Sequence, residues 1–208
     1  MPSWRVLARC VVLAVATILP AGCGGRSHYR PTPVVYLAPS VCRADLDQLH
    51  VQYVAAQAPA GPCPVYDAVR VNAAGVPWNR SGLVTCDLAL RLERFNREIV
   101  QPAAQRYLHT AVSQLRNLGT YSCRGQPNGE WSEHAKGDAI DVAGFALANG
   151  DTVMVERDWR SDGPKGEFLH AVARGACGLF SVVLTPHTNY EHRNHIHLDI
   201  GPWKDCSV

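Results

Sequence analysis

Residues 132–141 read SEHAKGDAID, and residues 192–199 read HRNHIHLD. The first stretch places an imidazole and a carboxylate seven residues apart, and the second places three imidazoles within six residues. A catalytic zinc ion takes three protein ligands of these types and keeps a fourth position open. We therefore predict a metal site for Zn²⁺ and a fold that brings the two stretches side by side.

The second stretch runs into an apolar segment that alternates like a strand. His195 and His197 alternate with the aliphatic residues of segment 196–200. Residues two apart on a strand point to the same face, so both rings can reach one ion or one substrate. Asp199 shares that face, where it would either support a ligand ring or form a salt bridge.

Helices are predicted where apolar residues recur at every third or fourth position. Thr85 is a suitable N-cap for the helix whose apolar face runs from Leu88 to Ile99. Pro102 either begins the next helix, which Gly119 would end, or kinks the preceding one. The predicted helices cover residues 42–56, 88–99, 102–118 and 166–174.

Strands are predicted where apolar residues form short runs between turn signals. Asn149-Gly150 is a hairpin signal between two such runs, and residues 73–81 read as a turn-rich loop. Strands mixed with helices and joined by short hairpins predict an α+β fold with an antiparallel sheet and flanking helices. The predicted strands cover residues 65–71, 120–123, 139–146, 153–155, 180–184 and 196–200.

The N-terminus has the pattern of an export signal. Arg5 and Arg9 precede an apolar run at residues 11–19. This run is too short to span a membrane but has the length of a signal peptide. We predict that residues 1–22 are a signal peptide and that the protein is exported to the bacterial periplasm or outer membrane.

Small residues stand directly before Cys23, as a bacterial lipoprotein peptidase requires. We predict that Cys23 is lipidated and that residues 23–40, which contain Pro31, Pro33 and Pro39, form a lipid anchor and a flexible tether to the membrane. Plain secretion and an uncleaved anchor are the alternatives.

The charge of the remaining chain is balanced. The full chain carries 20 basic and 18 acidic side chains, and loss of residues 1–22 removes Arg5 and Arg9 but no acid. A neutral chain offers no electrostatic case for binding nucleic acid. Residues 41–208 have the length of one domain with a full core, which we expect to be monomeric.

The cysteines agree with export. Apart from Cys10 and Cys23, six remain, and six in an exported domain indicate three disulfides. Their pairing is open; we first consider Cys42 with Cys63, because both flank one short amphipathic helix. The six are Cys42, Cys63, Cys86, Cys123, Cys177 and Cys206.

The motif SxHxxGxAxD, followed by HxH, resembles the zinc peptidases of the Hedgehog/D-Ala-D-Ala peptidase fold, which include the murein endopeptidases. More closely, residues 42–201 resemble the extensin-like C-terminal domain family of bacterial envelope proteins. The matching segments are YSCR at 121–124, DVAGF at 141–145, GAC at 175–177 and HIHLD at 195–199.

This resemblance implies which residues hold the metal. The ligands of Zn²⁺ would be His134, Asp141 and His197. Ser132 and Asp138 are then candidates to orient the ligand rings through hydrogen bonds, together with Asp199 on the ligand strand.

The resemblance also implies residues for catalysis. His195, and with it His192, would lie beside the open coordination position, since the murein endopeptidases carry the same His-x-x-His-x-His run. Arg124 resembles an arginine that stabilises an oxyanion or holds a substrate carboxylate. The D-Ala-D-Ala dipeptidases of the same fold instead place a Glu three residues before their last ligand His, where Asn194 stands here. The general base therefore remains open.

These observations lead to a function and two alternatives. We expect a zinc-dependent metallopeptidase that acts on peptidoglycan cross-link peptides, at bonds that contain D-amino acids. One alternative is a catalytically inactive, zinc-containing binding module of the cell wall or periplasm. The other is a disulfide-linked structural protein without metal, which predicts that His134, Asp141 and His197 lie far apart.

Overall fold

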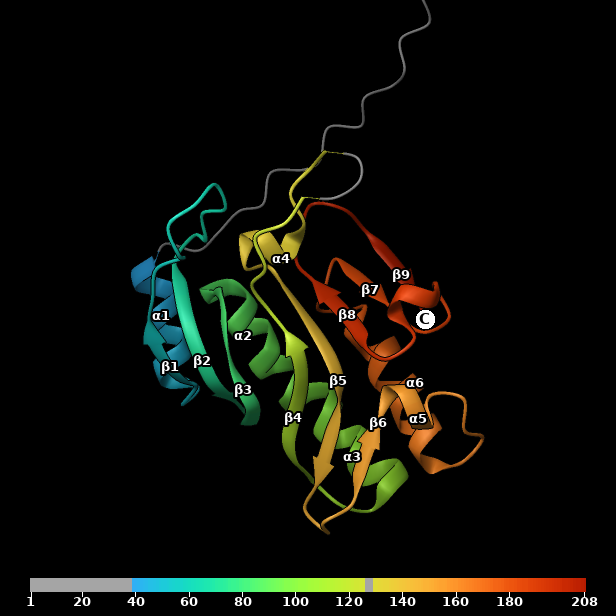
Figure 1. Ribbon diagram of the computed structural model, residues 1–208. Coiled ribbons are helices and arrows are strands. Elements are labelled where there is room, and N and C mark those ends of the chain that lie inside the picture. Colours follow the sequence, from blue (N-terminus) through green and yellow to red (C-terminus); the bar gives the residue numbers. More distant parts are fainter. Residues whose placement is uncertain (1–38, 126–128) are drawn as a thin grey trace, which may run out of the picture. The chain divides into compact units, whose positions relative to one another are not determined.

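The computed structural model describes residues 39–125 and 129–208. It contains a mixed β-sheet with helices against one face (Figure 1). Most neighbouring strands are antiparallel, while the pairs β3–β4 and β7–β9 are parallel. The α+β class is confirmed, but the sheet is mixed rather than wholly antiparallel. In pairing order the strands are β1 (Gln52–Ala55), β2 (Ala68–Ala74), β3 (Val76–Thr85), β4 (Val112–Gly119), β5 (Ala139–Leu147), β8 (Ile196–Asp199), β7 (Val182–Leu184) and β9 (Asp205–Ser207), with β6 (Thr152–Met154) also paired to β5.

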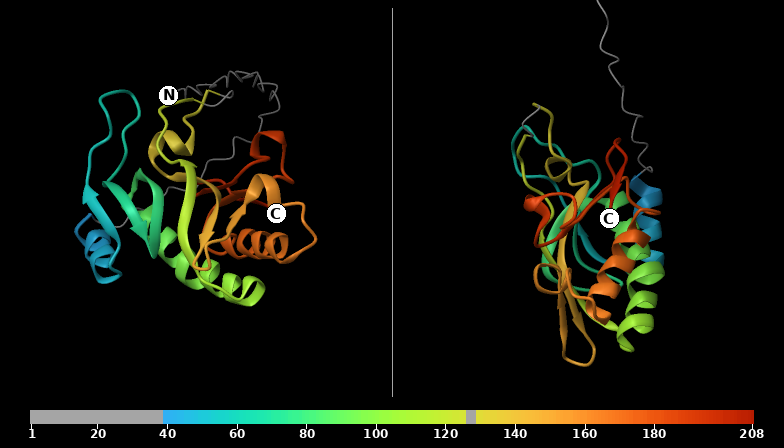
Figure 2. Two further views of the ribbon diagram at one scale, coloured as in Figure 1. Left: turned by 60° about the horizontal axis from the view of Figure 1, so that its bottom comes forward. Right: turned by 90° about the vertical axis from the view of Figure 1, so that its right-hand side faces the viewer.

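The longer helices cover one face of the sheet, which the right-hand view of Figure 2 shows edge-on. Thr85 caps α2 as predicted, because its hydroxyl accepts a hydrogen bond from the amide of Leu88. Pro102 lies in the first turn of α3, directly after the π-helical turn η1, which continues α2 without a break. The proline therefore stands within a continuous helical run, behind a π-helical turn, rather than at a separate helix start. The helices are α1 (Pro39–Gln48), α2 (Cys86–Phe95), the π-helical turn η1 (Asn96–Val100), α3 (Gln101–Leu108), α4 (Glu133–Lys136), α5 (Val155–Asp158), α6 (Pro164–Ala176) and the 3-10 turn η2 (Tyr190–His192).

The core lies between the sheet and these helices, and it decides which way the site faces. Ile140 and Val142 of β5 are fully buried in it, as are Ile196 and Leu198 of β8. Because successive strand residues point to opposite faces, the residues between them lie on the face away from the core. The side chains on this outer face include Asp141 and His197.

Two predicted helices end early. The helix predicted over 42–56 ends at Gln48, and β1 follows after His50, whose φ of 56° is left-handed. The helix predicted over 102–118 ends at Leu108, and His109, with a φ of 53°, starts the turn into β4. A residue with left-handed backbone angles terminates a helix. The spacing of the apolar residues after each of these positions fits a strand as well as a helix.

Two further local predictions are wrong. Residues 76–81, predicted as part of a loop, belong to β3, and residues 120–123, predicted as a strand, form no strand. The other predicted elements are present within a few residues of their predicted bounds. These are α2, β2, β5, β6, α6, β7 and β8.

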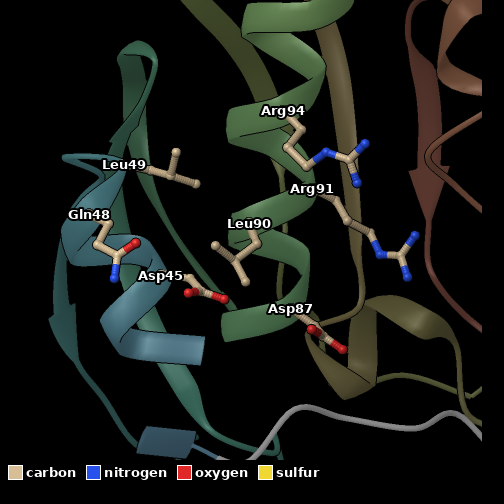
Figure 3. A pocket seen from close by; sticks show the side chains of 7 residues that line it. All are labelled: Asp45, Gln48, Leu49, Asp87, Leu90, Arg91 and Arg94. Carbon is tan, nitrogen blue, oxygen red and sulfur yellow. The ribbon is translucent and has the colours of Figure 1, made fainter. Parts of the chain in front are cut away.

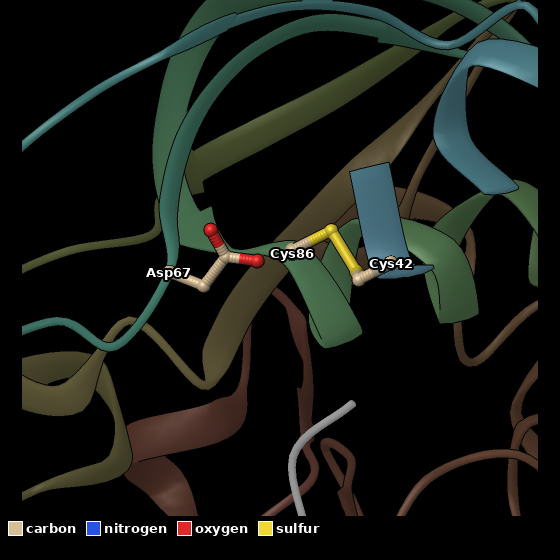
Figure 4. A group of neighbouring side chains, drawn as sticks. All are labelled: Cys42, Asp67 and Cys86. Carbon is tan, nitrogen blue, oxygen red and sulfur yellow. A yellow bond between two sulfur atoms is a disulfide. The ribbon is translucent and has the colours of Figure 1, made fainter. Parts of the chain in front are cut away.

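The six cysteines form three disulfides, as predicted, with pairs Cys42–Cys86, Cys63–Cys123 and Cys177–Cys206. The pairing Cys42–Cys63 is wrong. Because α1 ends at Gln48 and packs on α2, Cys42 meets the first residue of α2 instead. Figure 4 shows Asp67 beside this disulfide. Asp67 also forms an ion pair with Arg43.

Some predictions concern residues beyond those described. The predicted signal peptide (1–22) and the predicted lipidation site Cys23 lie outside the described residues. Helix α1 begins at Pro39, so it includes the last two residues of the predicted tether. Among the described residues, none of the helices has both the length and the apolar character that crossing a membrane requires.

A buried carboxylate on α2 gives a first testable prediction. Burial raises the pKa of Glu93, and the positive charge of Arg97 only partly offsets this. Because the folded chain binds this proton more tightly than the unfolded chain, the free energy of unfolding falls as pH rises through the raised pKa. Glu93→Gln should therefore stabilise the protein near pH 7, with a gain that vanishes below about pH 4.

Denaturant unfolding at a series of pH values measures this effect, and the exposed Glu167→Gln on α6 is the control. A Glu93→Gln variant that is less stable than the wild type at neutral pH would contradict the prediction.

Candidate metal centre

Three elements bring the predicted ligands together: His134 lies on α4, Asp141 on β5 and His197 on β8. In the β5–β8 ladder Asp141 is the direct partner of His197, so the register places both side chains on the outer face. His134 reaches them from the single turn of α4. Ser132 caps this turn, since its hydroxyl accepts a hydrogen bond of 3.3 Å from the amide of His134.

The turn closes tightly at Gly137, which has a φ of 74°. A Cβ there would lie 2.6 Å from Val65, so the position requires glycine for both conformation and space. The amide of Asp138 then returns to the carbonyl of Glu133 at 2.9 Å. These contacts fix the direction from which His134 approaches β5.

The three candidate ligand atoms lie about as far apart as the ligands of a tetrahedral zinc ion would. Nε2 of His134 lies 3.2 Å from Nδ1 of His197 and 3.2 Å from Oδ1 of Asp141, and the latter two atoms are 3.0 Å apart. Metal–ligand bonds of about 2.05 Å at tetrahedral angles put ligand atoms about 3.3 Å from each other. The arrangement therefore has the right size for one such ion.

In His134 and His197, the ring nitrogen that points away from Asp141 has its own hydrogen-bond acceptor. Nδ1 of His134 contacts the backbone carbonyl of Thr120, and Nε2 of His197 lies 3.1 Å from Oδ2 of Asp199. The other oxygen of Asp199 accepts a hydrogen bond of 2.9 Å from the amide of Gly201, which fixes this carboxylate. Carbonyl and carboxylate oxygens require a proton on the nitrogens that face them, so in a neutral ring the other nitrogen, which faces Asp141, presents a lone pair.

With both rings neutral, two lone pairs and the carboxylate of Asp141 would face one point. Such a group of acceptors is favourable only around a cation, and two imidazoles with one carboxylate are the donor set of hydrolytic zinc sites. The residues present therefore fit a zinc ion.

In the absence of an ion, protons on the imidazoles compensate the negative charge of Asp141. Burial alone would raise the pKa of Asp141, but hydrogen bonds to His134, His195 and His197 outweigh it and hold that pKa well below its usual range. Burial lowers the pKa of His197, but the hydrogen bonds to Asp141 and Asp199 prevail and raise it to about 9. A metal would have to displace this second proton from His197.

Two more imidazoles flank the ligands. Nε2 of His195 lies 3.3 Å from Oδ1 of Asp141, and the ring of His192 lies 5.2 Å from that of His195. Burial and the neighbouring rings of His195 and His197 lower the pKa of His192 to about 4. His195 precedes β8 rather than lying within it, but its ring still reaches the ligand group.

Asp138 lies at a helix cap. Its Oδ1 accepts a hydrogen bond of 2.8 Å from the hydroxyl of Thr85, whose amide binds the carbonyl of Gly137 at 2.9 Å. Asp138 therefore joins the N-terminus of α2 to the turn that carries His134.

This link gives a second prediction. Thr85→Val keeps the shape of the fully buried side chain but removes the hydroxyl that caps α2 and donates to Asp138, and should cost about 1–3 kcal/mol of unfolding free energy. Thr85→Ser, which keeps the hydroxyl, should cost about 1 kcal/mol for the lost methyl group. Denaturant unfolding compares the two; equal losses would show that the hydroxyl contributes little.

Arg124 lies apart from this group. Its side chain is exposed, and among the described residues it forms no ion pair with Asp141 or Asp199. Its backbone carbonyl accepts a hydrogen bond of 3.2 Å from the amide of Ser132, so the backbone at Arg124, though not the guanidinium, contacts the residue that caps α4.

Sequence reasoning missed three groups that hold the imidazoles. The carbonyl of Thr120 is a backbone acceptor, which any residue could supply, so no side-chain signal marks it. Asn189 and Asn194 accept from the Nδ1 atoms of His192 and His195 at 2.7 Å and 2.8 Å. Their closeness to the His-rich run was the available signal.

A separate groove of about 380 Å³ lies between α1 and α2 (Figure 3). Its charged lining comprises Asp45 and Asp87 with Arg91 and Arg94. None of the metal-site residues lines it, so the His–Asp group remains the candidate site.

Comparison with known proteins gives one match. A family model described as "Extensin-like protein C-terminus" matches residues 40–207. No curated protein and no solved structure matches the chain.

Proposed function

The chain belongs to the extensin-like protein C-terminus family, and we propose that it is a zinc-dependent peptidase that cleaves cross-link peptides of peptidoglycan at bonds containing D-amino acids. The observation that carries the proposal is the convergence of His134, Asp141 and His197 on one point, with ligand-atom separations of 3.0–3.2 Å. The resemblance of both motifs to the Hedgehog/D-Ala-D-Ala peptidases supports the reaction and the substrate class.

We divide the residues into those that would bind the zinc ion and those that would transfer protons. His134, Asp141 and His197 would hold the ion, and Thr120 and Asp199 keep the two ligand rings in the required tautomer. A bound zinc ion would lower the pKa of a coordinated water to about 7 and polarise the scissile carbonyl.

His195 is placed for proton transfer. Its Nε2 faces the ligand group, 3.3 Å from Oδ1 of Asp141, and its Nδ1 is held by Asn194 at 2.8 Å. It can therefore accept the proton of the attacking water and deliver it to the leaving amine. His192 lies behind it as a further imidazole at the same edge of the site.

The cellular setting forms part of the proposal. A lipid on Cys23 and a tether would keep the domain at a membrane within reach of the wall. The partner would be a peptidoglycan peptide bound by a monomer, without nucleic acid.

Digestion of purified sacculi tests the function. Wild-type protein should release peptide fragments, a chelator should stop the release, and added zinc should restore it. Mass spectrometry of the products identifies the bond. Release that a chelator leaves unchanged would exclude the metal-dependent reaction.

The alternative function is a zinc-containing binding module of the wall. The exposed position of Arg124 favours it, because that cation is not paired with the ligand group among the described residues. Stoichiometric zinc together with sacculus binding, but without release from any peptidoglycan type, would establish this alternative.

A further inference from the structure

An arginine without a counter-ion lies on the same face of the sheet as the candidate metal centre. In the β4–β5 ladder Leu115 is the partner of Phe145, and both are buried in the core. Arg116 follows Leu115 on the strand, so its side chain extends on the outer face, where that of Asp141 also lies. The arginine is half-buried, and within the part of the chain that the structure describes its guanidinium forms no ion pair and no hydrogen bond.

The strands on either side, β3 and β5, do not supply an acid at this position (Figure 1). On β5 the residue opposite Arg116 is Gly144, where a Cβ would lie 2.2 Å from the carbonyl oxygen of Val153. A side chain therefore cannot stand against the guanidinium from there. On β3 the side-chain amide of Asn79 is already bonded to the backbone of Asn117, at 2.8 Å and 3.2 Å. The neighbouring strands thus leave the positive charge of Arg116 uncompensated.

Arg116 lies at a distance from the metal centre that a short peptide can span. Its partner Gly144 follows Asp141 by three residues on β5, which corresponds to about 10 Å at the rise of a strand. An extended peptide advances about 3.3–3.6 Å per residue. A peptide that runs along the outer face, from a carbonyl at the metal, would bring its next few residues to the guanidinium.

A carboxylate is the group that this cation fits best. A guanidinium binds a carboxylate through two parallel, charge-assisted hydrogen bonds, and it is less strongly hydrated than an ammonium group. Because Arg116 is half-buried, water screens such a pair less than it would screen a pair on the open surface. The next residue on this face, Gln114, stands opposite Ala146, so the surface beside the guanidinium is neutral.

We propose that Arg116 binds the free carboxylate at the C-terminus of the substrate peptide, which lies along the outer face of β4 and β5 between Arg116 and Asp141. This inference deepens the proposed function and rests on it for the class of substrate. It gives Arg116 the carboxylate-binding role that the sequence predicted for Arg124. The protein would then favour bonds near a free C-terminus over bonds in a peptide whose C-terminus is blocked.

Peptide binding tests the role of Arg116 without requiring hydrolysis. The probes are acetyl-L-Lys-D-Ala-D-Ala with a free carboxylate and the same tripeptide as its C-terminal amide. All proteins carry His195→Ala, so that bound peptide is not consumed, and are supplied with zinc. NMR titration measures the dissociation constant of each probe. Arg116→Gln removes the charge and keeps a polar side chain, whereas Arg116→Lys keeps the charge.

Arg70→Gln is the matched control. Arg70 is an exposed arginine of β2, between the fully buried Val69 and Val71, so it lies on the same outer face as Arg116. The strand β3 separates it from β4. This variant changes the net charge by the same amount as Arg116→Gln and therefore measures the effect of net charge alone.

The His195→Ala protein should bind the free acid at least about 10-fold more tightly than the amide. Adding Arg116→Gln should lower the affinity for the free acid by about 10–100-fold and leave that for the amide unchanged. Arg116→Lys should recover part of the loss, because the charge remains but the bidentate geometry does not. Arg70→Gln should leave both affinities unchanged.

Equal affinity of the His195→Ala protein for the two probes, or no measurable binding of either, would overturn the proposal. So would a loss shared equally by acid and amide in Arg116→Gln, or the same loss in Arg70→Gln. Release from sacculi by the wild type reports on the proposed function separately. Chelator-sensitive release without a carboxylate preference would reject the role of Arg116 alone, and an Arg116-dependent preference without release would reject the proposed function alone.

Discussion

His197→Ala is expected to lower zinc affinity by at least about 100-fold, because it removes one of the three proposed ligands and the imidazole that contacts Oδ2 of Asp199. His195→Ala is expected to keep stoichiometric zinc and to lower hydrolysis by about 10²–10⁴-fold, because it removes only the proton-transfer group. The two substitutions remove the same chemical group at positions two residues apart. Comparing them therefore distinguishes a residue that binds the metal from one that transfers the proton.

Metal analysis by plasma emission and the sacculus assay measure both quantities. His187→Ala is the matched control, since this exposed imidazole belongs to the same C-terminal His-rich segment but contacts the ring of Trp159 rather than the ligands. If His195→Ala loses zinc and His197→Ala keeps it, the ligand assignment is reversed. If neither changes the metal content, the metal lies elsewhere.

The strands that carry the ligands could be predicted because their signals are local. Alternation in 196–200 and the apolar run at 139–146 are properties of neighbouring residues, and β8 and β5 follow them closely. The cap at Thr85 is local in the same sense. The ligand set, in contrast, came from resemblance, since no local rule pairs Asp141 with His197 across the sheet.

The errors arose where the outcome depends on distant parts of the chain. Residues 112–118 carry apolar side chains that fit a helix, but pairing with β5 makes them a strand. Cys42 has its partner 44 residues away because α1 packs on α2, which the sequence between them does not reveal. The acceptor for His134 is the backbone carbonyl of Thr120. Because every residue has such a carbonyl, the residue type at position 120 does not indicate this contact.

The disulfide Cys63–Cys123 should matter for the metal centre as well as for stability. It fixes the segment that follows β4, in which Thr120 accepts from the ring of His134 and the amide of Ser122 donates to the backbone carbonyl of His134 at 3.1 Å. Tyr121 adds a hydrogen bond of 3.1 Å to the carbonyl of Cys63. Loss of the bridge would free this segment and with it the orientation of one ligand ring.

Replacing both Cys63 and Cys123 by alanine is therefore expected to lower the free energy of unfolding by about 4 kcal/mol and zinc affinity by about 10–100-fold. The double alanine variant of Cys42 and Cys86 is the matched control. Its bridge spans 44 residues against 60, so the chain-entropy model gives the two losses within about 0.3 kcal/mol of each other.

The comparison separates two routes by which a lost bridge could weaken metal binding. Denaturant unfolding of the metal-free variants measures stability, and competition with a chromophoric chelator measures zinc affinity under conditions where both variants are folded. If stability alone governs the site, the two variants will lose affinity equally. If the segment 120–123 holds His134 in place, the variant without Cys63–Cys123 will lose more affinity than the control. The bridge between Cys42 and Cys86 joins α1 to α2, and its link to the turn of His134 runs through Thr85, which keeps its hydrogen bonds to Gly137 and Asp138 in both variants.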